Sequence, residues 1–212
     1  GDSVTFSVSA VVADGALFAI DANTGALSFI AAPDFENPGD VGLDNIYNVE
    51  VTATDTGTPG LTDVQTVAVT VTDANDAPVV TSSATANVAE NTTAVHSVTA
   101  SDQDGDIPTY TLTGGGDQTL FAIDLNTGVL TFNLAPDFEN PADVGTDNIY
   151  DVQVTAADGN GGTDIQDIAV SVTDANEAPT ITSLPAASIP ENTTAAHTVT
   201  ATDIDAGDSV TF

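Results

Sequence analysis

The sequence has 212 residues, of which 32 are Asp or Glu and none is Lys or Arg, so the formal net charge is −32. Nucleic acid is excluded as a partner because phosphate binding needs basic side chains, and an anionic membrane surface would repel the chain. No apolar run is long enough for direct insertion across a membrane. Because 41% of the residues are hydrophobic and Cys is absent, we expect a folded chain stabilised by cores or by ions.

The sequence is an internal repeat. FAIDANTGALSF at 18–29 matches FAIDLNTGVLTF at 121–132, an offset of 103 residues, and the offset across the linker is 101. The hexapeptide GDSVTF at 1–6 recurs at 207–212. We therefore predict repeats of about 102 residues. Residues 1–77 form a repeat that lacks its N-terminal head, 78–178 a complete repeat, and 179–212 the head of a third.

Each repeat is predicted to be all-β. Short alternating or β-branched runs, separated by Gly, Pro, Asn and Asp, are typical of a sandwich. Gly128 suits a hairpin position with positive φ, and no segment has a sustained helical period. In the complete copy the predicted strands lie near 79–82, 94–100, 108–113, 119–123, 128–133, 149–157 and 165–173.

Acidic residues gather in four short motifs per repeat. Acids at i and i+2 can direct two carboxylates at one centre, and hard dications take six to eight oxygen ligands. A single D-x-D is usually a solvated turn, but four motifs that recur in one order favour a metal site. Each motif occurs in two copies, which are Ala89-Glu90-Asn91 and Pro190-Glu191-Asn192; Asp102-Gln103-Asp104 and Asp203-Ile204-Asp205; Asp34-Phe35-Glu36 and Asp137-Phe138-Glu139; Asp73-Ala74-Asn75-Asp76 and Asp174-Ala175-Asn176-Glu177. In addition, a single Asp ends a long predicted strand at Asp55 and at Asp158.

These motifs resemble those of tandem cadherin repeats in the form found in bacterial adhesins. The match consists of P-E-N, D-x-D, D-F-E, A-x-D, a D-x-N-D-x-P linker and an F-x-I-D-x-x-T-G-x-L hairpin, and it covers essentially the whole chain. The resemblance implies seven-stranded Greek-key, Ig-like sandwiches in a linear rod. It also implies Ca²⁺ at each junction, held by P-E-N, D-x-E and the linker of one repeat and by D-x-D and A-x-D of the next.

The resemblance assigns ligands to two junctions. The first would use Asp34, Glu36, Asp73, Asn75, Asp76, Asp102, Asp104 and Asp158. The second would use Glu90, Asp137, Glu139, Asp174, Asn176, Glu177, Asp203 and Asp205. Asp55 would serve an upstream junction, and Glu191 completes the candidate set. Glu177 replaces the family's Asp, and Ala77 and Ala178 replace its Asn, which leaves two or three ions per junction open.

Other chemistry is disfavoured. Asp34 and Glu36 lack the separate environments that an acid–base pair needs, and His96 and His197 are expected as strand residues. We expect no enzymatic activity and predict a calcium-rigidified structural segment of a long extracellular filament or adhesin stalk. An adhesive module that binds a cell-surface or matrix ligand, and an accessory module of a secreted enzyme, remain alternatives.

The predicted partners are neighbouring repeats of the same protein, with head-to-tail and lateral self-assembly both open. A second chain that donates residues 178–206 would complete the first repeat. A window from a continuous chain is favoured over donation, because donation would make the second GDSVTF redundant.

Overall fold

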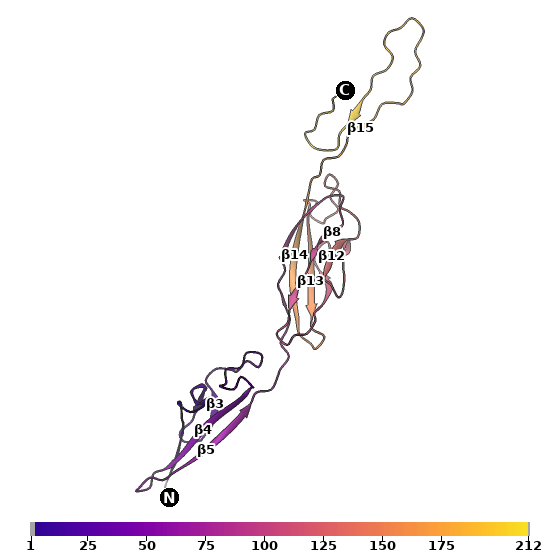
Figure 1. Ribbon diagram of the computed structural model, residues 1–212. Helices are drawn as coiled ribbons and strands as arrows, with labels where there is room; N and C mark the ends of the chain where they lie inside the picture. Colours follow the sequence, from indigo (N-terminus) through magenta and orange to yellow (C-terminus); the bar gives the residue numbers. More distant parts are fainter. Residues whose placement is uncertain (1–2, 212) are drawn as a thin grey trace. The chain divides into compact units, whose positions relative to one another are not determined.

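The computed structural model describes residues 3–211 (Figure 1). Gly1, Asp2 and Phe212, which belong to the repeated hexapeptide, lie outside the described residues. The chain divides into two compact units, Gly1–Asp76 and Ala77–Phe212. Both are all-β, and in the described range the helical content is two 3-10 turns of three residues. Neither turn has the length or apolar character of a membrane-spanning helix.

The second unit contains a complete sandwich. One sheet has the strand order β10-β13-β14-β7, a second has β11-β12-β8, and β6 pairs with β9. If β6 with β7, and β8 with β9, are counted as two interrupted strands, the total is the seven expected of this sandwich type. The elements are β6 (Val79–Val80), β7 (Thr85–Ala89), β8 (Ala94–Ser97), β9 (Ala100–Ser101), β10 (Thr109–Gly114), η2 (Gln118–Leu120), β11 (Phe121–Ile123), β12 (Val129–Phe132), β13 (Ile149–Ala157) and β14 (Thr163–Thr173).

Three details differ from the predicted strands. Strand β7 was not predicted, because its ladder partner is the distant β14, to which it runs parallel. The run predicted from residue 119 begins with the turn η2, so its strand begins at Phe121. The run predicted at 94–100 is interrupted at Val98 and Thr99, where the main chain of Val98 bonds to Gly128 instead of continuing the β8 ladder.

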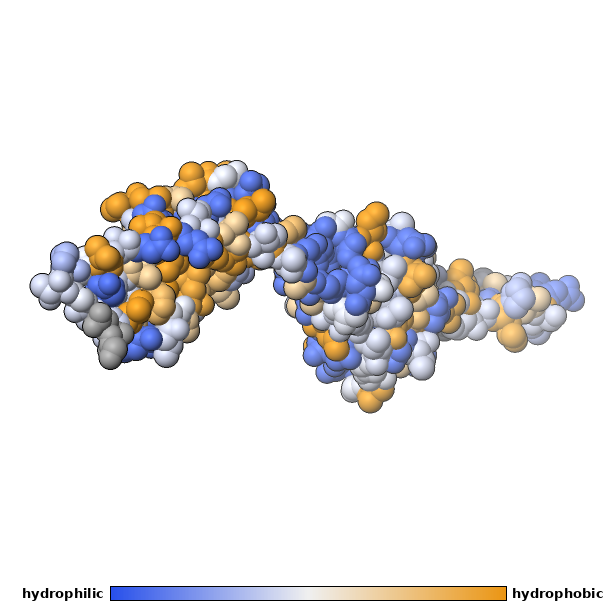
Figure 2. All heavy atoms as spheres, turned by 90° about the horizontal axis from the view of Figure 1, so that it is seen from below, coloured by the Kyte–Doolittle hydropathy of each residue, from blue (hydrophilic) through white to orange (hydrophobic). Residues whose placement is uncertain are grey.

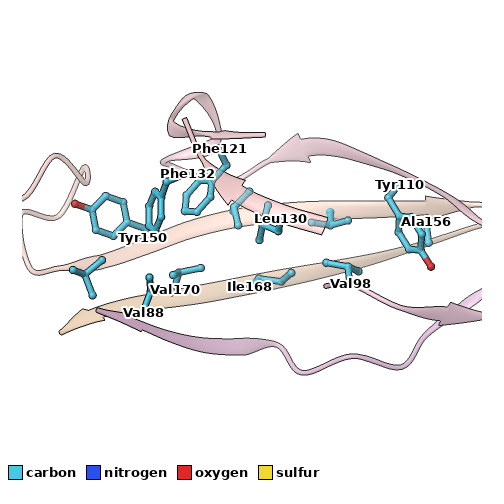
Figure 3. Close-up of a cluster of buried hydrophobic side chains, with 13 residues drawn as sticks. Val88, Val98, Tyr110, Phe121, Leu130, Phe132, Tyr150, Ala156, Ile168 and Val170 are labelled. Carbon is cyan, nitrogen blue, oxygen red and sulfur yellow. The ribbon is translucent and has the colours of Figure 1, made fainter. Parts of the chain in front are cut away.

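The core of this sandwich lies between its two main sheets (Figure 3). Leu130, Val154 and Val170 have no solvent exposure. The rings of Phe121 and Phe132 stack at 4.4 Å, and Phe132 meets Tyr150 edge-on at 5.1 Å. Such aromatic pairs add to the free energy gained from burial. Since each strand turns alternate side chains inward, one face of every strand supplies this core.

The first unit has the same plan with fewer strands. Its sheets have the orders β1-β4-β5 and β2-β3. Its aromatic cluster repeats that of the complete sandwich, with Phe29 and Tyr47 edge-on at 5.1 Å. The elements are β1 (Val4–Val8), η1 (Gly15–Leu17), β2 (Phe18–Ile20), β3 (Leu27–Phe29), β4 (Ile46–Asp55) and β5 (Thr62–Thr70).

The last part of the second unit is a short head. It contains the paired strands β15 (Thr180–Ile181) and β16 (Ala201–Thr202). This pairing reproduces that of β6 with β9 in the complete repeat. Residues 183–199 between them have no regular strand.

Candidate metal centres

Four carboxylates converge at the end of the complete sandwich. Oxygen atoms of Glu90, Glu139, Asp174 and Glu177 all lie within 4.8 Å of one another. We call this set the junction cluster. Its geometry follows from the parallel pairing of β7 and β14, in which Ala89 lies beside Thr173, so the next residue of each strand, Glu90 and Asp174, leaves the sheet at the same edge. Glu139 reaches the edge from the loop between β12 and β13.

Glu90 is the buried member of the junction cluster and holds its loops in place. Its side chain is 3% exposed. The Phe138 N–H donates to its Oε2 at 2.8 Å, and the Ala175 N–H donates to its Oε1 at 2.9 Å. One buried carboxylate therefore fixes both the loop that carries Glu139 and the linker that carries Asp174.

The linker is also tied to the head that follows it. The Asn91 side-chain amide donates to Glu177 Oε1 at 2.7 Å, and the Glu177 N–H donates to Asp205 Oδ2 at 2.9 Å. Among the described residues, Glu177 Oε2 and Asp205 Oδ1 are shielded from solvent and accept no hydrogen bond. Shielded carboxylate oxygens that lack donors are costly unless a positive charge is nearby.

The electrostatics of the junction cluster indicate crowding of negative charge. Burial raises the pKa of Glu177 to about 7, aided by a hydrogen bond shared with Asp205 and by repulsion from Glu90, Asp205 and Glu139. Burial and neighbouring carboxylates also raise the pKa of Glu139 and of Asp174. The sequence contains no Lys or Arg that could neutralise these groups. An all-oxygen, strongly negative set of this kind fits a hard divalent cation such as Ca²⁺.

The head carries a second acidic group. The side chains of Asp203, Asp205 and Asp208 lie within 4.8 Å of one another, and the Asp205 N–H donates to Asp203 Oδ1 at 3.2 Å. Asp208 was not among the predicted ligands. Because Asp205 also bonds to Glu177, this group adjoins the junction cluster.

The corresponding loop of the complete repeat has the same construction. Asp102, Asp104 and Asp106 lie within 4.8 Å of one another, and the Asp104 N–H donates to Asp102 Oδ1 at 3.0 Å. Asp106, which was not predicted, accepts a hydrogen bond from the Asn160 side chain at 2.6 Å. Asp158 accepts the Asn160 N–H at 2.6 Å, so the loop after β13 is held beside these acids.

The first unit holds the other residues predicted for the first junction. Carboxylate oxygens of Glu36 and Asp76 lie within 4.8 Å of each other. The Asn37 N–H donates to Asp34 at 3.0 Å, and the Asn75 amide donates to the Asp76 carbonyl at 3.1 Å. Asp73 follows β5 in the chain and is exposed. Asp55, at the end of β4, accepts N–H bonds from Gly57 and Leu61.

Comparisons with known proteins bear on the fold that carries these acidic clusters. Residues 75–171 match the family described as Bacterial Ig domain. The fold resembles human protocadherin-24 EC1-2, with TM-score 0.56, 22% identity and coverage of 82% of this chain and 83% of that one. It also resembles PcdhgB3 EC1-4, with TM-score 0.52, 28% identity and coverage of 98% of this chain and 50% of that one. The protocadherin gammaB7 EC3-6 cis-dimer gives TM-score 0.53 and 22% identity over 97% of this chain and 53% of that one.

The chain is built from cadherin-like, Ig-type tandem repeats. It spans about half the length of the PcdhgB3 and gammaB7 structures. No curated protein sequence matches it.

Three of the remaining predicted ligands belong to none of the groups of converging acids in the described residues, namely Asp137, Asn176 and Glu191. Asp137 accepts the Asn140 N–H at 3.0 Å and so closes its own turn. The Asn176 amide donates to the Glu177 carbonyl at 3.0 Å. Glu191, the counterpart of Glu90 in the head, is exposed. The turn around it is nevertheless formed as in the complete repeat, since Thr193 donates to the Pro190 carbonyl as Thr92 does to that of Ala89.

Two buried aspartates of the complete repeat were overlooked in the sequence. Asp117 is 4% exposed and accepts the N–H groups of Val144 and Asp151, both at 2.8 Å. Asp143 is 3% exposed and accepts the N–H groups of Asp147 and Asn148. Their oxygens accept main-chain N–H groups, so these carboxylates order the loop before β13, and neither belongs to a group of converging acids among the described residues.

The strand position of His96 agrees with its predicted structural role. It lies on β8 opposite Leu130, and burial lowers the pKa of its imidazole. The expectation was wrong for its counterpart His197, which is exposed in the head and lies in no strand.

Proposed function

We propose that the chain is a calcium-stiffened structural segment of an extracellular filament or adhesin stalk, without enzymatic activity. In this proposal the repeats are residues 1–77, 78–178 and 179–212, and neighbouring repeats are the partners. The observation that carries the proposal is the junction cluster, four carboxylates within 4.8 Å in a chain with no Lys or Arg. The hydrogen bond from the Glu177 N–H to Asp205 supports an ion shared across the proposed repeat boundary.

The proposed mechanism is electrostatic. Without cations, the carboxylates of the junction cluster and of the following head repel one another, and the linker swings. With Ca²⁺ bound, oxygens of both repeats enter one coordination shell and the linker stiffens. Glu90, Glu139, Asp174, Glu177, Asp203 and Asp205 are the proposed ligands at this boundary. The ligands predicted for the first junction, some of which lie before and some after the unit boundary at Asp76, are proposed to act in the same way.

The environment would set the stiffness. Extracellular calcium modules typically bind with Kd of about 10⁻⁴–10⁻³ M. Sites of this strength fill outside cells and stay empty in the cytosol. A filament built from such repeats would therefore become rigid after export.

Small-angle scattering and calorimetry test the proposal. Calcium is expected to lengthen the maximum dimension of the chain, narrow its conformational spread and raise its melting temperature, whereas equal magnesium does so weakly because Mg²⁺ demands octahedral geometry and keeps its waters. Sodium chloride of matched ionic strength controls for screening. Scattering and melting profiles that are the same in calcium and in chelator would refute the proposal.

A further inference from the structure

The loop between β13 and β14 contains the Asn-Gly pair of this sequence. Asn160 is followed by Gly161, whereas every other Asn precedes a residue with a side chain. The loop at the same place in the first unit, residues 56–61, contains no Asn. When a main-chain nitrogen attacks the amide of the preceding Asn, a side chain on the attacking residue obstructs the approach, and Gly has none. Asn160 is therefore the Asn of this chain that can react with its own main chain most readily.

The loop leaves this pair open to water. Asn160 and Gly161 are both exposed. A Cβ added at Gly159 or at Gly161 would meet no heavy atom within 4 Å, so the main chain has room to move on both sides of Asn160. Much of the surface of the complete sandwich is hydrophilic, as expected for polar loops of this kind (Figure 2). Packing therefore does not stop the amide of Asn160 from turning toward the next nitrogen.

Two half-buried acids hold the loop in a tight turn. Asp158 Oδ1 accepts the N–H groups of Asn160 at 2.6 Å, of Gly161 at 2.9 Å and of Gly162 at 3.0 Å. The side-chain amide of Asn160 donates to Asp106 Oδ2 at 2.6 Å. Because these bonds lie at the surface, water can replace them at a small cost in free energy. The reacting amide and the reacting nitrogen are thus ordered by the acids of this loop region and not by the core.

We propose that Asn160 is a site of spontaneous deamidation, which adds a charge beside the acidic group of Asp102, Asp104 and Asp106 as the protein ages. The nitrogen of Gly161 attacks Cγ of Asn160, the new N–C bond closes a cyclic imide, and the Cγ–Nδ2 bond breaks. Ammonia leaves and carries away the proton that the Gly161 nitrogen loses. Water then opens the imide at either carbonyl carbon, so position 160 becomes an aspartyl or an isoaspartyl residue without any enzyme, oxidant or cofactor.

The product changes the acidic group beside the loop. Oxygen atoms of Asp102, Asp104 and Asp106 already lie within 4.8 Å of one another. Asn160 donates a hydrogen bond to Asp106, whereas a carboxylate at position 160 has no donor and repels this acid. The sequence contains no Lys or Arg to compensate the added charge. Without cations, deamidation should therefore loosen the loop from these acids. A restoring effect of calcium rests on the proposed function, whereas the deamidation itself does not.

Peptide mapping of the aged chain tests the modification. A protease that cleaves before Asp releases residues 158–163, which contain Asn160, and residues 147–150, which contain Asn148 followed by Ile149 as the internal control. The folded 212-residue chain, kept at mildly alkaline pH below its melting temperature, should show the mass gain of deamidation in the first peptide and not in the second. An aspartyl product is cleaved again before position 160 and an isoaspartyl product is not, so the same digest separates the two. A parallel sample in urea gives the rate without the fold.

Two glycine variants test the chemistry. Gly161→Ala places a side chain on the attacking residue and should slow conversion at least about tenfold, which corresponds to a barrier higher by about 1.4 kcal/mol. Gly159→Ala is the matched control, because Gly159 also has a positive φ, 88° against 120° at Gly161, and its substitution leaves the Asn-Gly pair intact. This control should convert as fast as the unsubstituted chain.

A pair of substitutions at Asn160 tests the consequence. Asn160→Ala removes the hydrogen bond to Asp106 without adding a charge, whereas Asn160→Asp does both. In chelator, calorimetry should give a lower melting temperature for the Asp variant than for the Ala variant, because the added carboxylate is repelled by its neighbours. In calcium this difference should shrink, if the proposed function is right.

Four outcomes would overturn the proposal. These are an intact Asn160 in the folded chain after the sample in urea has converted, equal conversion of Asn148, equally fast conversion of the Gly161→Ala variant, or equal melting temperatures of the Asp and Ala variants in chelator. Deamidation at Asn160 together with a melting difference that calcium leaves unchanged would support the modification while contradicting the proposed calcium site.

Discussion

Replacing Glu90 by Gln separates its two tasks, which are to hold the loops of the junction cluster and to bind the ion. Glu90 accepts two main-chain N–H groups at 2.8 and 2.9 Å. The amide of Gln offers one acceptor and sets a donor against the other N–H. Losing one acceptor for a buried N–H costs about 1–3 kcal/mol. In chelator, relief of repulsion from Glu139, Asp174 and Glu177 offsets part of this cost, so the net loss of stability is smaller than the cost of the lost acceptor alone.

In calcium the variant should lose more. At about 10 mM Ca²⁺ and a Kd of about 10⁻⁴–10⁻³ M, one bound ion stabilises the folded state by about 1.4–2.7 kcal/mol. For a domain of this size this raises the melting temperature by about 6–20 °C. The Gln variant should lose most of that increase in melting temperature, because the ion loses one buried carboxylate ligand. The cluster also carries one negative charge less, so the ion relieves less repulsion when it binds.

Differential scanning calorimetry in chelator measures the loss of stability without the ion, and calorimetry in calcium measures the increase in melting temperature that the ion produces. Amide hydrogen exchange at Phe138 and Ala175 reports the two hydrogen bonds directly. The control Asp167→Asn removes one charge from the middle of β14, where Asp167 accepts from Gln153, and should leave the calcium increment unchanged. A full calcium increment in the Gln variant would refute the role of Glu90 as a ligand, and unchanged exchange would refute its role in holding the loops.

Four further predictions concern Glu177 and Gly128. Glu177→Gln should raise the melting temperature in chelator, because it removes a crowded charge, yet weaken calcium binding in isothermal titration; a fall in chelator would contradict this. Because the pKa of Glu177 is raised from its ordinary value of 4.5 to about 7, the chain without calcium should lose stability as pH rises between those values. Calcium should release protons near pH 6, seen as a buffer-dependent binding enthalpy, and a buffer-independent enthalpy would contradict the assignment. Gly128→Ala should destabilise the complete repeat by more than about 1 kcal/mol in urea unfolding, because φ is 66° and a Cβ would lie 2.1 Å from the Val98 carbonyl oxygen. Gly159→Ala, with φ 88° and open space, should show the smaller backbone cost, and equal losses would contradict the clash.

The sequence predicted those features whose signal is local. Strands β13 and β14 alternate strongly, and the two acids of each D-x-D stand two residues apart, so their convergence could be inferred. The same spacing misled in D-F-E, where Glu139 joins the junction cluster and Asp137 closes its own turn. Strand β7 was missed because the pairing that defines it joins Val88 to Val172, far along the chain. Asp106 was missed because its partner Asn160 comes from another loop.

Burial was the property that the sequence pattern could not give. Asp117 and Glu90 are both acids in turn-like segments. Both carboxylate oxygens of Asp117 accept N–H groups, from Val144 in the loop before β13 and from Asp151. Glu90 also accepts two N–H groups, but its position beside Asp174 and Glu139 leaves it facing the cluster. Spacing alone does not distinguish an acid that orders a loop from one that faces an ion.

The parallel pairing of β7 with β14 has a mechanical consequence. Tension applied to the two ends of the complete repeat draws the chain that enters it in one direction and the chain that leaves it, after β14, in the other. Because the two strands run parallel through five residue pairs, from Thr85 beside Ala169 to Ala89 beside Thr173, this tension slides one along the other. All five pairs bear the load together and must break nearly at once, whereas the hydrogen bonds of an antiparallel pair pulled from one end would break one after another. In the proposed stalk, this pairing would resist stretching of the repeat along the axis of load.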